Sequence, residues 1–313
     1  MIAEMTNVVK RYGTHVALDH LNLTVKKGEL LGLLGPNGAG KSTTIKALTG
    51  LTGYDTGEIL LFGKKMTGSA IDIKRRLGVV PQDLALYETL SAKDNLEYFG
   101  RLYGLSGKNL KQRTDEVLKA IGLTDVAKNP PKTFSGGMKR RLNIGCAVMH
   151  KPELLILDEP TVGIDPQSRN HILDLIEDLS QSGTTVIYTS HYMEEVERLC
   201  SRVLIIDAGR VIANGSVEEI TTSMLFEETM TMEVKNPTPT LTDDIKKIQG
   251  VINCEISGRR LTVTSAAGSA NLPRILDLAM PHVILGVTAH KPTLEDAFLS
   301  LTGKKLRDGG GEL

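Results

Sequence analysis

Residues 35–43 read GPNGAGKST and follow the apolar run LLGLL at residues 30–34. The pattern G-x-x-x-x-G-K-S is typical of a loop that wraps phosphates between a strand and a helix. Backbone N–H groups at the start of that helix can point at phosphate oxygens, and Lys41 adds a charge for the β- and γ-phosphates. We therefore predict a nucleotide site formed by Gly35, Pro36, Asn37, Gly38, Ala39, Gly40, Lys41, Ser42 and Thr43.

The composition bounds the class of protein. The 313 residues are enough for one large domain and a smaller one. Lys+Arg and Asp+Glu number 37 each, so the net charge is zero. Proteins that hold a nucleic-acid backbone usually carry a basic excess, and no nucleic-acid partner is expected here.

The cysteines and the apolar runs indicate in which cellular compartment the chain is expected. Cys146, Cys200 and Cys254 lie far apart and show no metal-type spacing, which favours a reduced, cytosolic setting. No signal-peptide pattern opens the sequence, and its apolar runs fall far short of the roughly 20 residues of a membrane span. We expect a cytoplasmic chain that reaches a membrane only through a partner.

Four short apolar runs predict buried strands, because they are continuous rather than alternating. Helical patterns separate them, for example at residues 42–51 and 168–180. Strands and helices in alternation predict an α/β fold with a mostly parallel sheet. The four runs are residues 30–34, 77–80, 154–157 and 184–189.

Each predicted strand ends in a polar or glycine-rich segment. In open α/β sheets, ligands bind beyond the carboxyl ends of the strands. Side chains that are scattered along the sequence are therefore predicted to converge on one site, namely Lys41, Gln82, Asp158, Glu159 and His191.

The chemistry of these groups suits phosphoryl transfer to water. Asp158 can hold Mg²⁺ directly or through water, the Ser42 hydroxyl can ligate the same ion, and Glu159 can act as general base. We expect Gln82 to sense Mg²⁺ or the attacking water, and His191 to hydrogen-bond the γ-phosphate. Read alone, a Gln or a His at a strand end is more often an ordinary polar group.

The remaining sequence divides into further regions. Residues 7–30 alternate like small antiparallel strands, and residues 88–150 predict a helical subdomain within an ATPase domain at 1–220. Residues 221–303 follow the order β-α-β-β-α-β of a ferredoxin-like domain. Its last helix begins with Thr293 and Asp296 in capping-box spacing, and residues 304–313 are expected to be a flexible tail.

A second small-residue turn, Ser135-Gly136-Gly137, opens a helix within FSGGMKRRLNIGCAVM. A helix N-terminus of this kind can bind an anion, but the chain has only one lysine-bearing phosphate loop. Two interpretations stay open. The turn is a plain helix cap, or it grips the nucleotide of a second copy, with two ATP molecules between two chains.

Together these residues resemble the full motif set of an ABC ATPase, over about residues 5–215: GPNGAGKST, Gln82, SGGMKRR, LLILDEP, Asp165 in TVGIDP and His191. The resemblance implies a head-to-tail dimer in which Ser135 and Gly137 contact the partner's γ-phosphate. It also implies that Tyr12 stacks on adenine and that Asp165 communicates between the two sites. The chain departs from the family at Phe134, Met138 and Ile164, none of which must touch phosphate.

The segments SGGMKRR, LYETLSAKDNLEYFG and PTLEDAFLSLTG resemble the exporter branch, whose membrane subunits are encoded separately. This resemblance implies an ATPase on the inner face of the cell membrane, bound to a transmembrane permease. An importer ATPase with a C-terminal sensor is the alternative. A non-transport ABC protein acting on ribosomes or DNA fits less well, because those usually carry two ATPase domains or a long coiled coil.

Four aromatic residues gather at the start of the helical region, although Phe and Tyr total only 12 in the chain. They form either a small satellite core or a groove for a short helix of the membrane subunit. Gln82 lies just upstream, so a groove there could respond to the nucleotide. The four residues are Tyr87, Tyr98, Phe99 and Tyr103.

Overall fold

The computed structural model describes residues 1–223, 228–266, 268–290 and 293–303. Within them the chain forms two compact units, which divide between Ser216 and Val217. The expected boundary was at residue 220, but helix α8 (Val217–Ser223) packs against α11 (Leu294–Thr302) and so belongs with the second unit. The expected tail, residues 304–313, lies outside the described residues.

A six-stranded sheet forms the centre of the first unit, in the order β10-β9-β3-β8-β7-β6. All neighbouring strands are parallel except β10, which runs antiparallel to β9. The four apolar runs form four of these strands, so the predicted parallel sheet is confirmed. The strands are β3 (Leu30–Leu34), β6 (Leu77–Val80), β7 (Leu154–Asp158), β8 (Thr185–Thr189), β9 (Arg202–Asp207) and β10 (Arg210–Gly215).

Every residue of β3 and β8 is buried, as expected for strands that helices cover on one face and another layer covers on the other. The crossover connections carry helices α1 (Lys41–Leu48), α6 (Pro166–Gln181) and α7 (Met193–Leu199). Because these strands are parallel, their carboxyl ends lie at the same edge of the sheet.

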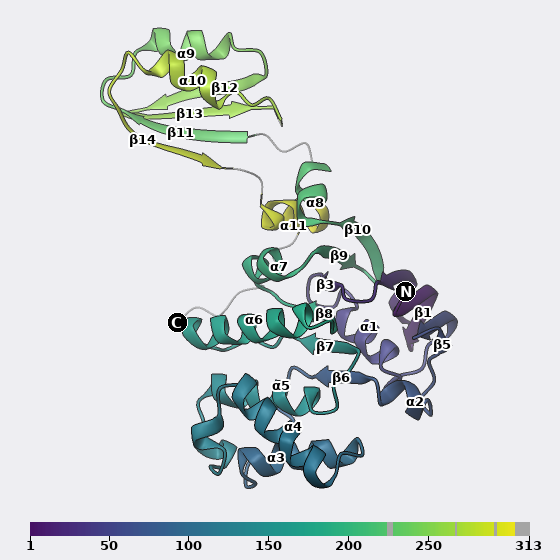
Figure 1. Cartoon of the computed structure of the whole chain (residues 1–313). Helices are drawn as coiled ribbons and strands as arrows, with labels where there is room; N and C mark the ends of the chain where they lie inside the picture. The colour runs from purple at the N-terminus through teal and green to yellow at the C-terminus, as the bar shows by residue number, and fades with distance from the viewer. Residues whose placement is uncertain (224–227, 267, 291–292, 304–313) are drawn as a thin grey trace. The chain divides into compact units, whose positions relative to one another are not determined.

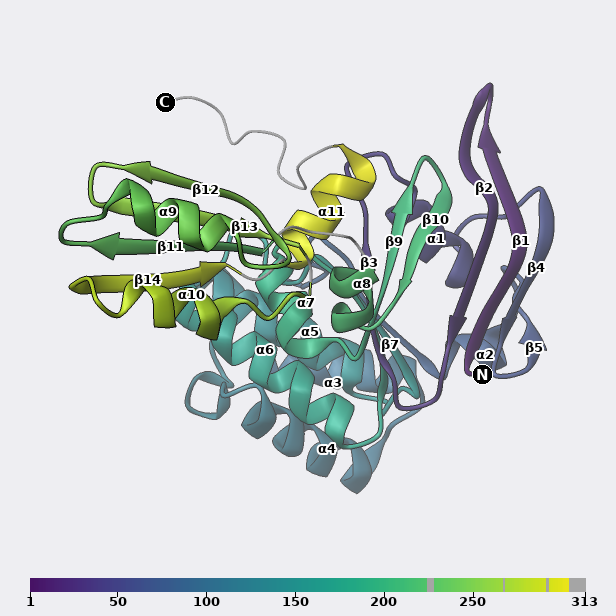
Figure 2. The same ribbon diagram turned by 90° about the horizontal axis from the view of Figure 1, so that it is seen from above.

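A second, antiparallel sheet has the order β2-β1-β4-β5. Its long hairpin and β4 lie side by side in Figure 2. Leu21 and Leu23 of this sheet share one apolar core with Leu31 and Leu33 of the parallel sheet. The elements are β1 (Ala3–Tyr12), β2 (His15–Val25), β4 (Thr56–Leu61) and β5 (Lys64–Lys65), followed by the short helix α2 (Ile71–Lys74).

The region expected to be helical contains three α-helices, α3 (Ala92–Leu102), α4 (Gly107–Ala120) and α5 (Gly136–Val148). Figure 1 shows them as a group beside β6, and α5 packs against that strand. Two 3-10 turns, η1 (Thr124–Val126) and η2 (Pro131–Thr133), connect α4 to α5.

The second unit has the predicted ferredoxin-like topology. Its strands pair in the order β12-β13-β11-β14, and all neighbours are antiparallel. Two helices cover one face, over a core that includes Met232, Leu261 and Ile245. The elements are β11 (Glu228–Val234), α9 (Pro239–Lys246), β12 (Val251–Ser257), β13 (Arg260–Ser265), α10 (Leu272–Ala279) and β14 (Ile284–His290).

Helix α11 begins with the predicted capping box. Thr293 accepts from the backbone N–H of Asp296, and the Asp296 carboxylate accepts from the backbone N–H of Thr293. The helix ends on Gly303, whose φ of 63° suits a left-handed C-cap. Among the helices in the described ranges, none combines the length and apolarity that crossing a bilayer requires.

Candidate nucleotide site

A cavity of about 530 Å³ lies at the carboxyl edge of the parallel sheet, where four strands end. It brings together most of the predicted site residues from segments that are far apart in sequence. The lining comprises Tyr12, His15, Ala17, Pro36, Asn37, Gly38, Ala39, Gly40, Lys41, Ser42, Thr43, Gln82, Glu159, Val162 and His191.

The glycines of the phosphate loop are required by their surroundings. A Cβ on Gly35 would lie 2.3 Å from the Ile206 carbonyl oxygen, and one on Gly40 would lie 2.7 Å from that of Ala17. Gly38 and Gly40 have φ values of 79° and 109°, which disfavour any side chain. The surrounding backbone and the loop's own conformation therefore require glycine at these positions.

Lys41 occupies the hollow of this loop and is 6% exposed. Its Nζ donates to the carbonyl oxygens of Gly35 at 2.5 Å and Pro36 at 3.2 Å. Burial lowers the pKa of Lys41, and the negative charges of Glu159 and Asp158 oppose that shift. A desolvated ammonium in this position would gain strongly from the charge of a phosphate.

Glu159 stands at the centre of the polar cluster. Its Oε1 lies 2.6 Å from Nε2 of His191, and its Oε2 accepts from Nε2 of Gln82 at 2.9 Å. The backbone N–H of Glu159 donates to Oγ1 of Thr189, which fixes its left-handed backbone at φ 50°. The hydrogen bond from His191 lowers the pKa of Glu159, so the carboxylate is charged at neutral pH.

Asp158 ends β7 beside this cluster, outside the residues that line the cavity. Oγ1 of Thr189 donates to its Oδ1 at 2.8 Å, and burial raises its pKa. Asp158, Ser42 and Gln82 offer carboxylate, hydroxyl and amide oxygens, which are the hard donors that Mg²⁺ prefers. A divalent cation would also relieve the burial of the Asp158 charge, so the predicted donor set fits the ion.

Tyr12 is 48% exposed at the end of β1, with Nζ of Lys10 5.1 Å from its ring centroid. It pairs with His15 across a tight turn in which Gly13 has φ 60°. Sequence reasoning singled out Tyr12 but missed His15, Ala17 and Val162. The alternating pattern and the Gly13 turn could have placed His15 opposite Tyr12, since a short hairpin turn fixes the register.

The small-residue turn lies elsewhere, because the cavity lining includes none of Ser135, Gly136, Gly137 and Asp165. Ser135 caps α5 by accepting from the N–H of Met138, and Asp165 caps α6 by accepting from the N–H of Ser168 at 2.9 Å. The two helix starts touch, since a Cβ on Gly137 would lie 2.3 Å from the Ser168 side chain. Within one chain, this turn is a helix cap.

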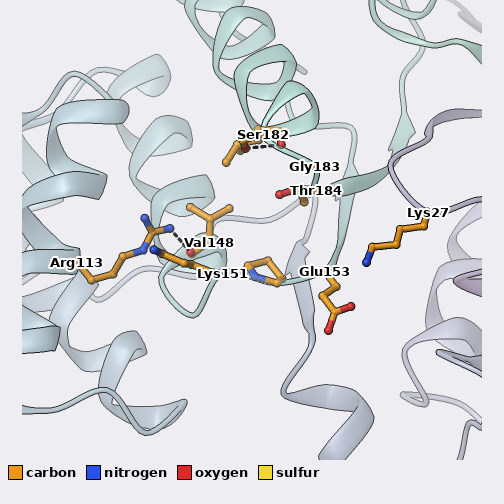
Figure 3. A pocket seen from close by; sticks show the side chains of 10 residues that line it. Lys27, Arg113, Val148, Lys151, Glu153, Ser182, Gly183 and Thr184 are labelled. Carbon is orange, nitrogen blue, oxygen red and sulfur yellow. Dashed lines mark hydrogen bonds between the residues drawn. The ribbon is translucent and has the colours of Figure 1, made fainter.

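A second cavity, of about 560 Å³, opens at the opposite, amino-terminal edge of the sheet (Figure 3). It is lined by three cations, Lys27, Arg113 and Lys151, near the C-terminal ends of α5 and α6. Arg113 donates to the carbonyl oxygens of Val148 at 2.7 Å and Met149 at 3.1 Å. Arg113 therefore complements the C-terminal end of α5, whose partial charge is negative. The Glu153 carboxylate also lines this cavity, and both negative groups disfavour a phosphate here.

The phosphate loop, the buried lysine and the acidic residues at one sheet edge are those of a P-loop nucleotide hydrolase. A family profile described as ABC transporter matches residues 18–162. The chain is 45% identical over 306 residues to the linearmycin resistance ATP-binding protein LnrL of Bacillus subtilis (strain 168), which covers 96% of this chain and 98% of that protein. The chain therefore belongs to the family of ABC transporter ATP-binding proteins and is an ATP hydrolase.

Two further matches agree with this assignment. The Nod factor export ATP-binding protein I of Cupriavidus metallidurans is 40% identical over 309 residues, which cover 98% of this chain and 99% of that protein. A solved dimeric, post-hydrolysis structure of the ATP-binding cassette MJ0796 bound to ADP and Pi superposes with a TM-score of 0.62 and 28% identity. That match covers 68% of this chain and 98% of the cassette.

Proposed function

We propose that this chain is the ATP-hydrolysing subunit of an exporter, and that two copies close around two MgATP to drive a separate membrane permease. The observation that carries the proposal is the position of Glu159, held between His191 and Gln82 at the mouth of the phosphate loop. The relatives named for Nod factor export and linearmycin resistance favour export as the direction.

Each group has a role in this proposal. The phosphate loop and Lys41 hold the phosphates, and Tyr12 stacks on adenine. Ser42, Gln82 and Asp158 would hold Mg²⁺, which when bound neutralises phosphate charge. Glu159 takes a proton from the attacking water, and His191 donates to the γ-phosphate.

A second copy completes the site. Ser135, Gly136 and Gly137 present a helix N-terminus that lies outside the chain's own cavity. Such N–H groups bind anions, so they suit the γ-phosphate held by a partner chain. Asp165 caps the helix that touches this turn and would link the two sites. The dimeric cassette of the solved relative supports this arrangement.

The link to the permease would run through Gln82. The guanidinium of Arg140 donates to the carbonyl oxygens of Pro81 at 3.1 Å and Gln82 at 2.9 Å, which fastens α5 to the Gln82 segment. Tyr87 and Tyr98 nearby are 46% and 39% exposed. A nucleotide-dependent shift of Gln82 would therefore move an aromatic surface suited to a short helix of the permease.

The predicted aromatic group is divided in the structure. Tyr87, Tyr98 and Phe99 pack together, with the Tyr87 and Tyr98 centroids 4.8 Å apart. Tyr103 instead stacks on His150, with centroids 3.6 Å apart. Only the first three belong to the surface that we propose for the permease.

Co-purification of tagged protein from native membranes, with mass spectrometry of the bound partner, tests the proposal. We expect a multi-spanning protein that lacks its own ATPase domain, which places the chain at the inner face of the cell membrane. Recovery of ribosomes or DNA instead would leave the ATPase chemistry in place and overturn the transport role. We propose that residues 217–303 stabilise the dimer or regulate its closure, and deleting them with no effect on either would contradict this.

A further inference from the structure

Glu195, on α7, is a buried acid outside the cavity lining, and only 3% of it is exposed. Its Oε2 accepts hydrogen bonds from three hydroxyl groups. The donors are Oγ of Ser190 at 2.5 Å, the phenol of Tyr188 at 2.8 Å and Oγ1 of Thr161 at 2.9 Å. Its Oε1 lies 3.5 Å from Nε of Arg169, on α6.

The donors come from the segments that carry the proposed chemistry. Thr161 lies two residues after Glu159, and Ser190 directly precedes His191. These segments follow β7 and β8, which are neighbouring parallel strands. Oε2 of Glu195 therefore accepts hydrogen bonds from both chain segments, just beyond the ends of β7 and β8.

We infer that Glu195 is a positioning residue that sets the distance between Glu159 and His191. It acts through Thr161 on the segment after β7 and through Ser190 on the segment after β8. The inference rests on the proposed roles of Glu159 and His191.

A carboxylate is the group that this position needs. A carboxylate oxygen can accept several hydrogen bonds. In a glutamine, the amide N–H₂ group would face either the three hydroxyl donors or Arg169, and some of these donors would lose their acceptor. Burial raises the pKa of Tyr188 well above its ordinary value, so the phenol keeps the proton that it donates. Oγ of Ser190 also accepts from the backbone N–H of Tyr192 at 2.9 Å, which fixes the backbone on both sides of His191.

Arg169 extends the network to α6. Its guanidinium carbon lies 4.1 Å from the ring centroid of Tyr192, the residue after His191. A side chain of α6 therefore also contacts the His191 segment. Helix α6 begins at the Asp165 cap, which we propose lies near the partner chain. Glu195 therefore joins the Asp165 helix, the Glu159 segment and the His191 segment.

The test compares Glu195→Gln with Glu194→Gln, an exposed acid one position earlier on the same helix. In steady-state MgATP hydrolysis by the full chain, we expect kcat of Glu195→Gln to fall about tenfold to a hundredfold, because small misplacements are costly. KM should stay within about twofold, since the phosphate loop is untouched. The Glu194→Gln variant should match wild type. An unchanged kcat, or a change in KM alone, would overturn the inference.

A double-mutant cycle separates positioning from a general loss of stability. In a His191→Ala background, we expect Glu195→Gln to add little further loss of kcat, because the pair that it positions is already broken. If the two substitutions act independently, so that their fold-losses of kcat multiply in the double mutant, the inference is contradicted. If Glu195→Gln does not fold, Ser190→Ala and Thr161→Val enter the same cycle. Glu159→Gln is the reference, because retained turnover in that variant would refute the proposed function itself, whatever Glu195 does.

Discussion

Nε2 of His191 lies 2.6 Å from Oε1 of Glu159. Gln82 occupies the other carboxylate oxygen at 2.9 Å, so the proposed base is partnered on both sides in this structure. The hydrogen bond from His191 lowers the pKa of Glu159, so the carboxylate becomes a stronger base when this partner turns away. In the proposed mechanism the γ-phosphate and Mg²⁺ would compete with Glu159 for His191 and Gln82, which would couple activation of the base to nucleotide binding.

Replacing Glu159 with Gln should abolish hydrolysis while preserving ATP binding. The amide keeps the shape of the side chain but cannot take the proton from water, so we expect turnover to fall about 100-fold or more. ATP-bound dimers should then accumulate, because closure no longer leads to hydrolysis. Phosphate release and size-exclusion chromatography with ATP measure both effects. Wild-type turnover would remove Glu159 as the base.

The two glycines of the small-residue turn should respond differently to alanine. A Cβ on Gly137 would lie 2.3 Å from Cβ and Oγ of Ser168, whereas one on Gly136 would lie 3.5 Å from Cδ1 of Ile164, an ordinary contact. We expect Gly137→Ala to lower the free energy of unfolding by about 1–3 kcal/mol through overpacking, and Gly136→Ala to have little effect. Urea unfolding of the purified protein without nucleotide measures both.

A compensating change checks the cause of that loss. Ser168→Gly removes the opposing side chain but keeps the backbone N–H that Asp165 caps. We expect it to restore part of the stability of Gly137→Ala. A Gly137→Ala variant that is as stable as wild type would contradict the assignment of this glycine to packing against Ser168.

The exposed aromatic cluster should matter for assembly more than for stability. The phenol of Tyr87 donates to that of Tyr98 at 3.1 Å, and Tyr98 packs edge-to-face on Phe99. We expect Tyr98→Ala combined with Phe99→Ala to weaken capture of the permease about tenfold or more, as loss of aromatic anchors does in interfaces. The isolated double variant should still hydrolyse ATP. Full-strength capture by a folded variant would favour the satellite-core interpretation instead.

The ion pair between Arg76 and Glu153 should make a stability contribution that depends on pH. Nε of Arg76 lies 2.6 Å from Oε1 of Glu153, and this hydrogen bond lowers the pKa of Glu153 below its ordinary 4.5. The stabilisation is present above pH 4.5 and is lost as the pH falls through the lowered pKa.

Glu153→Gln isolates this effect, because it removes the charge and leaves Arg76 stacked on Phe62 at 3.7 Å. Both side chains are more than a third exposed, so solvent screening limits the loss at neutral pH to about 0.5 kcal/mol. Urea unfolding across pH should show the gap between wild type and variant narrowing below pH 4.5. A gap of constant size would contradict the assignment.

The sequence alone predicted the framework. Continuous apolar runs can be buried on both faces only in a covered parallel sheet, and parallel strands place their carboxyl ends at one edge. These two rules predict that Lys41, Gln82, Glu159 and His191 converge, and all four line the cavity. The ferredoxin-like order of strands and helices could also be predicted, because each element shows the hydrophobic periodicity of a strand or a helix within its own sequence.

Only the tertiary structure decided the contacts between distant side chains. Oγ1 of Thr161 reaches Glu195 across 34 positions, and the guanidinium of Arg140 reaches Gln82 across 58. Periodicity says which face a residue takes, but not which rotamer or which partner it finds across a packed interface. Gly137 appeared in the sequence as a phosphate contact, whereas the fold adds an intrachain reason for it, the Ser168 side chain against which it packs.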